Sequence, residues 1–310
     1  MENLDSTQIE SLHRLTRDIK QASVTLAPAE VRYLVDAYYQ MQENRKAAEN
    51  QVRALTTSGE PHEVIRWLAD NAALLERNVK AVLDVHTSST PIGRWAKSVV
   101  GIGPVIAAGL AAHIDITKAP TVGHIWRFAG LDPTMTWEKG EKRPWNADLR
   151  TLCWKVGQSF MKVSNRENDF YGHLWRDRKA REETKNLAGA FVDQARAKLE
   201  RFKIDKKTDA WKWYAGCLTP EAAHRVLETT SEQRAALLKK LAGPAGSGQP
   251  MLPLGHIDAR ARRWTVKLFL SHWWEVAYEL HHGTKPPNPY VITYLEHVDQ
   301  IRPPNWPMTV

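Results

Sequence analysis

The chain contains 310 residues, of which 43% are hydrophobic, and it carries a net charge of +8 and a pI of about 9.4. This length permits a buried core and about two domains, and the basic surplus favours a polyanionic partner, nucleic acid before a membrane surface. The two cysteines, Cys153 and Cys217, are too few for a disulfide framework or a cysteine-based metal site, and they fit a reducing cytoplasm.

Nothing in the sequence predicts a membrane protein. The first residues, 1–5, are polar and acidic, which is not the pattern of a signal peptide. No apolar run reaches the ~20 residues of a membrane span. We therefore expect a cytoplasmic protein with no membrane partner.

Residues 1–90 are expected to form a helical hairpin or a short coiled-coil region. Pro28 and Pro61 begin two long helices that end near residues 57 and 85. Before them, apolar residues follow the helical repeat within residues 5–24: Ile9, Leu12, Leu15 and Ile19. These helices bring no catalytic groups together, so we expect them to serve packing or homodimerisation.

Residues 91–165 hold the most informative stretch of the chain. Two apolar helical segments, at about 92–99 and 104–113, meet at Gly101-Ile102-Gly103, and Pro104 opens the second segment. Glycine permits a positive φ, and proline suits the first helical turn, where N–H groups lack partners. The pattern predicts a helix-hairpin-helix element whose free amides grip a nucleic-acid phosphate. Alternatively, the same residues form a close turn between two packed helices.

The remaining elements are also predicted to be helical. Within 91–165, further helices are expected at about 121–129 and 146–163. Residues 166–250 read as a helical insertion that begins with one long charged helix, about 170–202, and ends in a flexible linker at 243–250. Shorter helices of the insertion begin near Asp209, Pro220 and Ser231. Residues 251–310 are expected to form a basic helix at 257–282, a short helix at 289–299 and a proline-rich tail. No run alternates with period two, so the predicted fold class is all-α.

Two segments together resemble one known family. Val100–Ala108 reads Val-Gly-Ile-Gly-Pro-Val-Ile-Ala-Ala, and Phe128–Pro133 reads Phe-Ala-Gly-Leu-Asp-Pro. Their order and spacing are similar to the C-terminal helix-hairpin-helix domain of Piv/MooV-type ("IS one-ten") insertion-sequence transposases. The resemblance covers about residues 95–165, and Gly255–Arg263 looks like the start of the family's basic helix. It implies a helical domain that binds DNA backbone during DNA transposition, a form of DNA recombination.

The chain departs from that family in the catalytic parts. Family members carry an N-terminal RNase-H-like domain whose carboxylates hold two Mg²⁺ ions, whereas residues 1–90 show no strand pattern that would present such carboxylates. The family's serine nucleophile follows the Gly-Leu-x-Pro motif, but no serine occurs between Leu131 and Gln158. We therefore leave the catalytic residues unassigned, and we predict no metal ion or other cofactor. The resemblance carries over only the hairpin: Gly101, Ile102, Gly103 and Pro104.

Three groups of basic residues are candidates for phosphate contacts. Lys97 and Arg94 precede the hairpin by one or two turns on its first helix. A second group combines phosphate-binding cations with tryptophans that can stack on bases: Lys139, Lys142, Arg143, Arg150 and Lys155, interleaved with Trp137, Trp145 and Trp154. In a third group, Arg260, Arg263 and Lys267 are spaced i, i+3, i+7 on one helix. Alternatively, each group is an ordinary solvated helix face. Trp154 is expected to face a core, together with Leu149 and Cys153.

These features together predict an all-helical DNA-binding protein of a mobile element or phage, which holds DNA, or structured RNA, through its backbone phosphates. Two rival functions stay open. In the first, the protein is an active recombinase whose chemistry comes from unfamiliar residues: Asp132, Thr134, Thr136, Glu138, Glu141 or Asp148. In the second, it is a helical scaffold whose working surface is the pair of long N-terminal helices.

Overall fold

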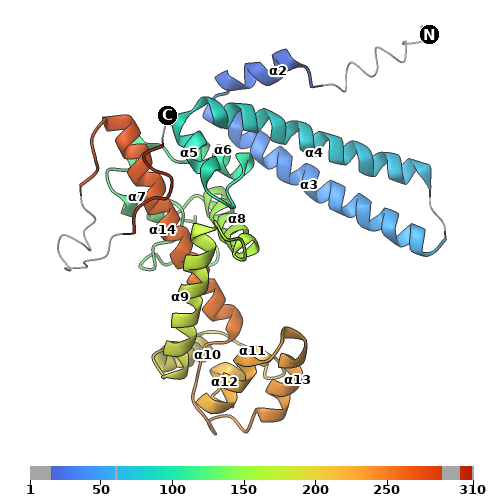
Figure 1. Cartoon of the computed structure of the whole chain (residues 1–310). Coiled ribbons are helices and arrows are strands. Elements are labelled where there is room, and N and C mark those ends of the chain that lie inside the picture. Colours follow the sequence, from blue (N-terminus) through green and yellow to red (C-terminus); the bar gives the residue numbers. More distant parts are fainter. Residues whose placement is uncertain (1–14, 60–61, 288–300, 309–310) are drawn as a thin grey trace. The chain divides into compact units, whose positions relative to one another are not determined.

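A computed structural model of the protein describes residues 15–59, 62–287 and 301–308. The chain forms two compact units: unit 1 comprises 1–159 and 267–310, and unit 2 comprises 160–266. Every element in the described ranges is a helix, so the predicted all-α class is confirmed (Figure 1). None of these helices combines the length and the apolarity that crossing a lipid bilayer requires.

Unit 1 contains the N-terminal helices and the predicted hairpin. Its helices are α2 (Arg17–Ala22), α3 (Pro28–Thr57), α4 (Glu63–Ser89), α5 (Pro91–Ser98), α6 (Pro104–His113), α7 (Val122–Phe128), most of α8 (Ala147–Val163) and the C-terminal part of α14 (Leu254–His282), with 3₁₀ turns η1 (Ser23–Thr25) and η2 (Ile116–Lys118). The helices predicted at 28–57, 92–99, 104–113 and 121–129 are confirmed to within one or two residues. The predicted helix at 289–299 and residues 5–14 of the first one lie outside the described residues.

The main core of unit 1 lies where α3 and α4 meet α6. The two long helices run side by side (α3 blue and α4 blue-green in Figure 1) and close over α6 at one end. The buried side chains of this core are Val31, Val35, Leu83, Val105, Ala108 and Ala112. Helix α6 is buried almost all round, which explains its content of alanine and glycine: a Cβ on Gly109 would lie 2.8 Å from Leu152 Cδ2 of α8. Small residues thus let α6 and α8 approach closely, and this contact positions the hairpin.

A polar network fixes α3 against α4 beyond that core. The carboxylate of Glu76, which is 8% exposed, forms an ion pair with Arg45 and accepts a hydrogen bond from Gln42 Nε2 at 3.1 Å. Burial and the nearby Glu76 raise the pKa of Tyr38 to about 12. Because a buried polar group is costly unless it is paired, this network selects one register for the two long helices.

A second core of unit 1 is aromatic. Trp95 of α5 stacks on Phe269 of α14, with 6.0 Å between the ring centres. It also meets Trp273 edge-on, with 6.2 Å between the ring centres. The chain segment 301–308 lies against the same helices. Trp95 Nε1 donates to the carbonyl oxygen of Pro304 at 2.9 Å, and the side-chain amide of Asn305 donates to the carbonyl oxygen of Ser98 at 2.9 Å. The tail therefore caps the end of α5, next to the hairpin turn.

Unit 2 is built from five complete helices and parts of α8 and α14. The five are α9 (Phe170–Leu187), α10 (Val192–Arg201), α11 (Asp209–Tyr214), α12 (Pro220–Glu228) and α13 (Ser231–Leu241). The predicted starts at Asp209, Pro220 and Ser231 are confirmed. The single long helix predicted at 170–202 is wrong, because the chain breaks at Gly189, which has φ +85°. Glycine adopts that left-handed conformation without steric cost, so it ends α9.

Residues 243–250 do not behave as the predicted flexible linker. The N–H groups of Gly243, Gly246 and Gly248 donate to the carbonyl oxygens of Cys217, Ala215 and Gly216 at 2.8–2.9 Å. A Cβ on Gly248 would lie 2.1 Å from the carbonyl oxygen of Leu218, so only glycine permits this contact. The composition of the segment reflects close backbone packing inside unit 2. Its glycines allow the backbone of residues 215–218 to approach closely, and they do not mark a hinge.

Candidate nucleic-acid interface

The turn between α5 and α6 has the backbone that its glycines require. Gly101 adopts φ +96°, a region that L side chains rarely enter. Gly103 is the N-cap of α6 with φ −92° and ψ 175°, and it has no side chain to cap the helix. Pro104 follows as the first helical residue, where its missing N–H costs nothing. Residues 99–103 thus form a tight turn that joins two short helices, α5 and α6.

The start of α6 leaves backbone donors unused. Within the described part of the chain, the N–H groups of Gly103, Val105 and Ile106 donate to no acceptor. The side of Gly103 is open, since a Cβ placed there would meet nothing within 4 Å. Ile102, only 4% exposed, anchors the turn in the core. Free donors on an anchored turn at the positive end of a helix form an arrangement that suits an oxyanion.

A serine from α8 braces this turn. The hydroxyl of Ser159 donates a hydrogen bond to the carbonyl oxygen of Gly101. With that carbonyl occupied, the peptide plane beside Gly101 is fixed, and the following amides are held in one orientation. The sequence alone gave no indication of this bond, because 58 residues separate its partners.

Lys97 is not free to contact a phosphate. Its ammonium forms an ion pair with Asp84 of α4 and donates to Ser88 Oγ at 2.6 Å. Arg94, one turn earlier on α5, donates to the carbonyl oxygen of Ser88 at 3.0 Å. Both cations tie α5 to the end of α4. The charge that Lys97 brings to the hairpin is therefore largely compensated inside the protein.

The second basic group forms a continuous stack, here called the aromatic–basic cluster: Arg143, Trp137, Trp145 and Arg150. The Arg143 guanidinium lies 5.3 Å from the centre of the Trp137 ring, the two indoles meet edge-on at 6.3 Å, and the Arg150 guanidinium lies 4.5 Å from the Trp145 ring. A Cβ on Gly130, which has φ +65°, would clash with Trp145 at 2.7 Å. The glycine of the Phe-Ala-Gly-Leu-Asp-Pro segment thus makes room for the cluster.

The outer face of α8 continues this cluster into solvent. Arg150 is exposed, as is Lys142 in the preceding loop. Trp154, one helical turn after Arg150, is 60% exposed, so the expectation that it faces a core is wrong. Its neighbours Leu149 and Cys153 are buried as predicted, and burial raises the pKa of the Cys153 thiol to about 12. An indole in water beside an arginine is able to stack on an unpaired base.

The third basic group is divided between the two units. In unit 1, Lys267 lies with its ammonium 4.1 Å from the centre of the Trp126 ring, and burial lowers its pKa. In unit 2, Arg260 pairs with the buried carboxylate of Glu182 at 2.8 Å and donates to Gln194 at 2.9 Å. Arg263 of the same unit is exposed. Lys267 and Arg260 are thus engaged within the protein, and a role for the three residues in phosphate contact stays a prediction.

Two residues of the rival recombinase hypothesis, Asp132 and Thr134, are bonded to each other. Asp132 accepts hydrogen bonds from the N–H and hydroxyl of Thr134 at 2.9 and 2.7 Å, which lowers its pKa. It caps its own turn. Within residues 15–59, 62–287 and 301–308, no group of three His, Cys, Asp or Glu side chains is placed to hold a metal ion.

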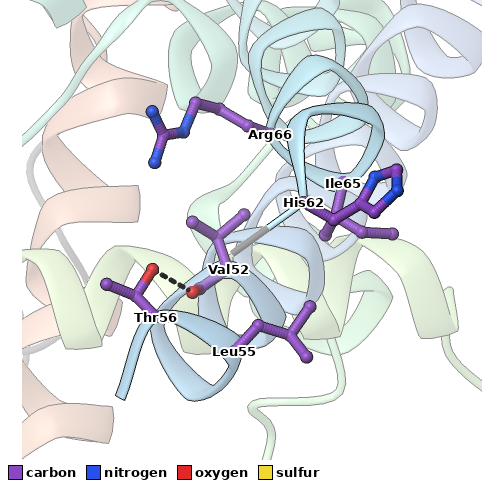
Figure 2. A pocket seen from close by; sticks show the side chains of 6 residues that line it. All are labelled: Val52, Leu55, Thr56, His62, Ile65 and Arg66. Carbon is purple, nitrogen blue, oxygen red and sulfur yellow. Dashed lines mark hydrogen bonds between the residues drawn. The ribbon is translucent and has the colours of Figure 1, made fainter. Parts of the chain in front are cut away.

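A small pocket, which none of the candidate residues named above lines, lies at the tip of the α3–α4 hairpin (Figure 2). It is lined by Val52, Leu55, Thr56, His62, Ile65 and Arg66. The Thr56 hydroxyl donates to the carbonyl oxygen of Val52 at 2.7 Å, and His62 Nδ1 accepts from the N–H of Val64 at 3.2 Å. Both polar groups are thus used to end one helix and begin the next. The pocket is a gap at a helix turn and brings no reactive groups together.

Comparisons with protein-family models, with curated proteins and with solved structures found no match to this chain. The structure assembles the hairpin turn and, separately, the aromatic–basic cluster, both in unit 1.

Proposed function

We propose that this is a DNA-binding protein that grips the phosphodiester backbone through the α5–α6 hairpin. The single observation that carries the proposal is the set of three N–H groups at the start of α6, on Gly103, Val105 and Ile106, that find no acceptor among the residues the structure describes. A phosphate there gains charge-assisted hydrogen bonds and about 0.3–1 kcal/mol from the helix dipole. Because backbone amides read no base, this contact is independent of sequence.

The aromatic–basic cluster supports the same proposal. Arg150 and Arg143 are held over indole rings, which orders their guanidinium groups before any ligand arrives. Lys142 adds a further exposed cation in the loop between α7 and α8. These residues neutralise phosphates, and each such contact releases counterions, so binding weakens steeply with salt.

The proposal extends to the setting in which the protein works. The two motifs in residues 95–165 favour a role in DNA transposition or recombination in a mobile element or phage, as a binding component. The two free, buried cysteines are consistent with the cytoplasm. Structured RNA carries the same phosphates and is the alternative ligand. We also propose that the protein is a homodimer joined by its N-terminal helices.

The test is a binding series with the full chain. Fluorescence anisotropy of a labelled duplex is recorded over a range of NaCl concentrations, with an unrelated duplex, a single strand and a structured RNA in parallel. The proposal predicts similar affinity for the two duplexes and a linear fall of log K with log salt. Absence of binding at low salt overturns it. A supercoiled plasmid with Mg²⁺ is the companion assay, and any nick or covalent adduct would favour the recombinase.

A further inference from the structure

The positive charge of the chain is divided unevenly between its two units. Unit 2 contains 21 Lys and Arg residues against 13 Asp and Glu residues, whereas unit 1 contains 22 of each kind. The net charge of +8 therefore belongs entirely to unit 2, to which the proposed function assigns no task. A basic surplus confined to one unit favours a polyanion as the partner of that unit.

Several cations of unit 2 are compensated within the fold. The buried carboxylate of Glu182 pairs with Arg178 at 2.5 Å and with Arg260 at 2.8 Å. On α14, Asp258 pairs with Arg262 at 2.7 Å. These arginines hold α9 and α14 in place, so we look elsewhere in unit 2 for the cations that meet a ligand.

The segment that joins α10 to α11 carries cations without such partners. Six of the twelve residues at 196–207 are Lys or Arg. Asp205 accepts a hydrogen bond from the N–H of Lys207 at 2.9 Å and so shapes the turn. Five cations form no ion pair within the described part of the chain, and they are here called the basic segment: Lys198, Arg201, Lys203, Lys206 and Lys207.

Packing orders the basic segment before any ligand arrives. Leu199 and Ile204 pack against the core formed by Ala195, Tyr214, Leu252 and Ile257. Between them, the Phe202 ring is 45% exposed, with the Lys198 ammonium 3.7 Å and the Arg201 guanidinium 5.6 Å from its centre. A segment anchored in this way loses less conformational freedom on binding than a free tail would.

The end of α10 explains only part of this charge. Lys198 and Arg201 lie in its last turn, where a cation is favoured by the helix dipole. The three lysines Lys203, Lys206 and Lys207 follow the end of the helix, and all three are exposed. The dipole gives no reason for them, whereas a polyanionic ligand does.

The positive charge of α10 also acts on the start of α14. Burial lowers the pKa of His256 to about 4, and the charges of Arg263, Arg260 and Lys198 contribute to this decrease. The imidazole therefore lies among cations of both helices. An anion bound beside Lys198 would meet the same positive potential.

The composition of the basic segment favours a nucleic acid over a lipid surface. A helix that binds lipid inserts an apolar face between the head groups. The apolar residues Ala195 and Leu199 of α10 are already used in the core of unit 2. What remains outside is a row of cations around one phenyl ring, a combination that contacts phosphates and stacks on an unpaired base.

We propose that the basic segment of unit 2 binds the phosphate backbone of a nucleic acid, as a contact separate from the α5–α6 hairpin. The inference goes beyond the proposed function, because it adds a site in the other unit that uses side chains and no hairpin amide. Each lysine that neutralises a phosphate releases a counterion, so the basic segment contributes to the salt dependence of binding.

The first test removes three cations from the full chain: Lys203→Gln, Lys206→Gln and Lys207→Gln. All three side chains are exposed, so the helical circular dichroism spectrum should not change. Anisotropy of a labelled duplex should show affinity at moderate salt lower by about tenfold or more, and a slope of log K against log salt smaller by about two to three.

A matched variant removes the same charge elsewhere in unit 2. Arg225→Gln, Lys239→Gln and Lys240→Gln change three exposed cations of α12 and α13. The slope for this variant should stay close to that of the wild type. Equal slopes for the two triple variants would show that only net charge matters and would overturn the proposal, as would a wild-type slope for the first variant.

The second test locates the contact on the wild-type chain. Limited acetylation of lysines is read by mass spectrometry with and without duplex. Bound duplex should protect Lys203, Lys206 and Lys207 severalfold, while Lys239 and Lys240 react as before. Equal protection at all five, or none, overturns the proposal. Vesicles that contain phosphatidylserine should protect none of them; protection by vesicles and not by duplex would identify a lipid surface instead.

Gly103→Asp separates this contact from the hairpin. If the Gly103→Asp chain binds duplex with wild-type affinity and its three lysines are still protected, the hairpin contact alone is refuted. If binding depends on Gly103 and the three lysines neither matter nor become protected, the basic segment alone is refuted.

Discussion

The hydroxyl of Ser159 on α8 donates a hydrogen bond to the carbonyl oxygen of Gly101, the residue whose positive φ turns the chain from α5 into α6. This bond joins the turn to a helix that also carries Arg150, an exposed cation of the aromatic–basic cluster. Within unit 1, α8 therefore supports the amides of the turn at one point and presents a phosphate-binding side chain at another.

Removing this brace should loosen the turn. Ser159→Ala deletes the donor and leaves the Gly101 carbonyl oxygen without it, at a cost of about 1 kcal/mol in the free energy of unfolding. DNA binding should also weaken, because the amides that follow lose a fixed orientation. Urea unfolding and anisotropy measure the two effects. Thr151→Ala, on the same helix with its hydroxyl bonded to the carbonyl oxygen of Ala147, is the control and should leave DNA binding unchanged.

Arg150 should contribute one phosphate contact. Arg150→Ala is expected to weaken duplex binding uniformly across sequences and to reduce the slope of log K against log salt by about one. Arg53→Ala removes the same charge from an exposed position on α3 and should leave the slope unchanged. Equal slopes for the two variants would show that Arg150 does not touch the backbone.

Trp154 should distinguish single strands from duplexes. Its indole is exposed and able to stack on an unpaired base, an interaction worth about 1–3 kcal/mol per base. Trp154→Ala should therefore weaken binding of a single strand while binding of a duplex, whose bases are stacked, changes little. Parallel anisotropy titrations with both ligands give the comparison. Equal losses on the two ligands would contradict a stacking role.

Unit 1 should lose stability as the pH falls below neutrality. Burial lowers the pKa of His272 from 6.5 to about 4, and its Nε2 lies 2.7 Å from the carbonyl oxygen of Ile301. The unfolded chain binds the proton at higher pH than the folded one. Stability is therefore complete above pH 6.5 and declines until about pH 4. A difference of one in pKa is worth about 1.4 kcal/mol, so the full loss is about 3 kcal/mol.

Guanidinium unfolding at pH 7 and pH 5 measures this decline. His272→Gln keeps an N–H donor for the Ile301 carbonyl oxygen and removes the titration. The variant should show a smaller difference between the two pH values than the wild type. His256 in unit 2, whose pKa burial also lowers to about 4, is unchanged in that variant and accounts for a residual decline. An identical pH response of both proteins would refute the assignment to His272.

The sequence predicted helices and turns better than it predicted which distant residues bond to one another. Gly101, through its positive φ, and Pro104, at the first helical position, favour a turn through their own backbone preferences, so the two helices and the turn between them could be predicted without coordinates. Ser159 could not, because its hydroxyl bonds a carbonyl oxygen that lies far away in the chain. The partner of Lys97 was missed for the same reason, since Asp84 belongs to another helix.

Glycine-rich segments were the other source of error. Gly189 lies in a charged stretch with good helix formers, and only its φ of +85° ends the helix. The glycines at 243–248 resemble a linker by composition, but they allow the chain to lie against residues 215–218. Trp154 was misjudged because its apolar neighbours on α8 are buried. The helical repeat places it on the outer face with Arg150, one turn away.

The central claim is that free amides at the start of α6 hold a phosphate, and Gly103→Asp tests it most directly. Gly103 has the extended backbone of an N-cap and open space for a side chain. Aspartate there should cap α6 and preserve or raise the melting temperature. Its carboxylate takes the amides and repels a phosphate, and Gly103→Asn is the matched control that caps without the charge. The account predicts that duplex affinity falls about tenfold or more with aspartate, and less with asparagine. Wild-type affinity of a folded Gly103→Asp protein at moderate salt would contradict it.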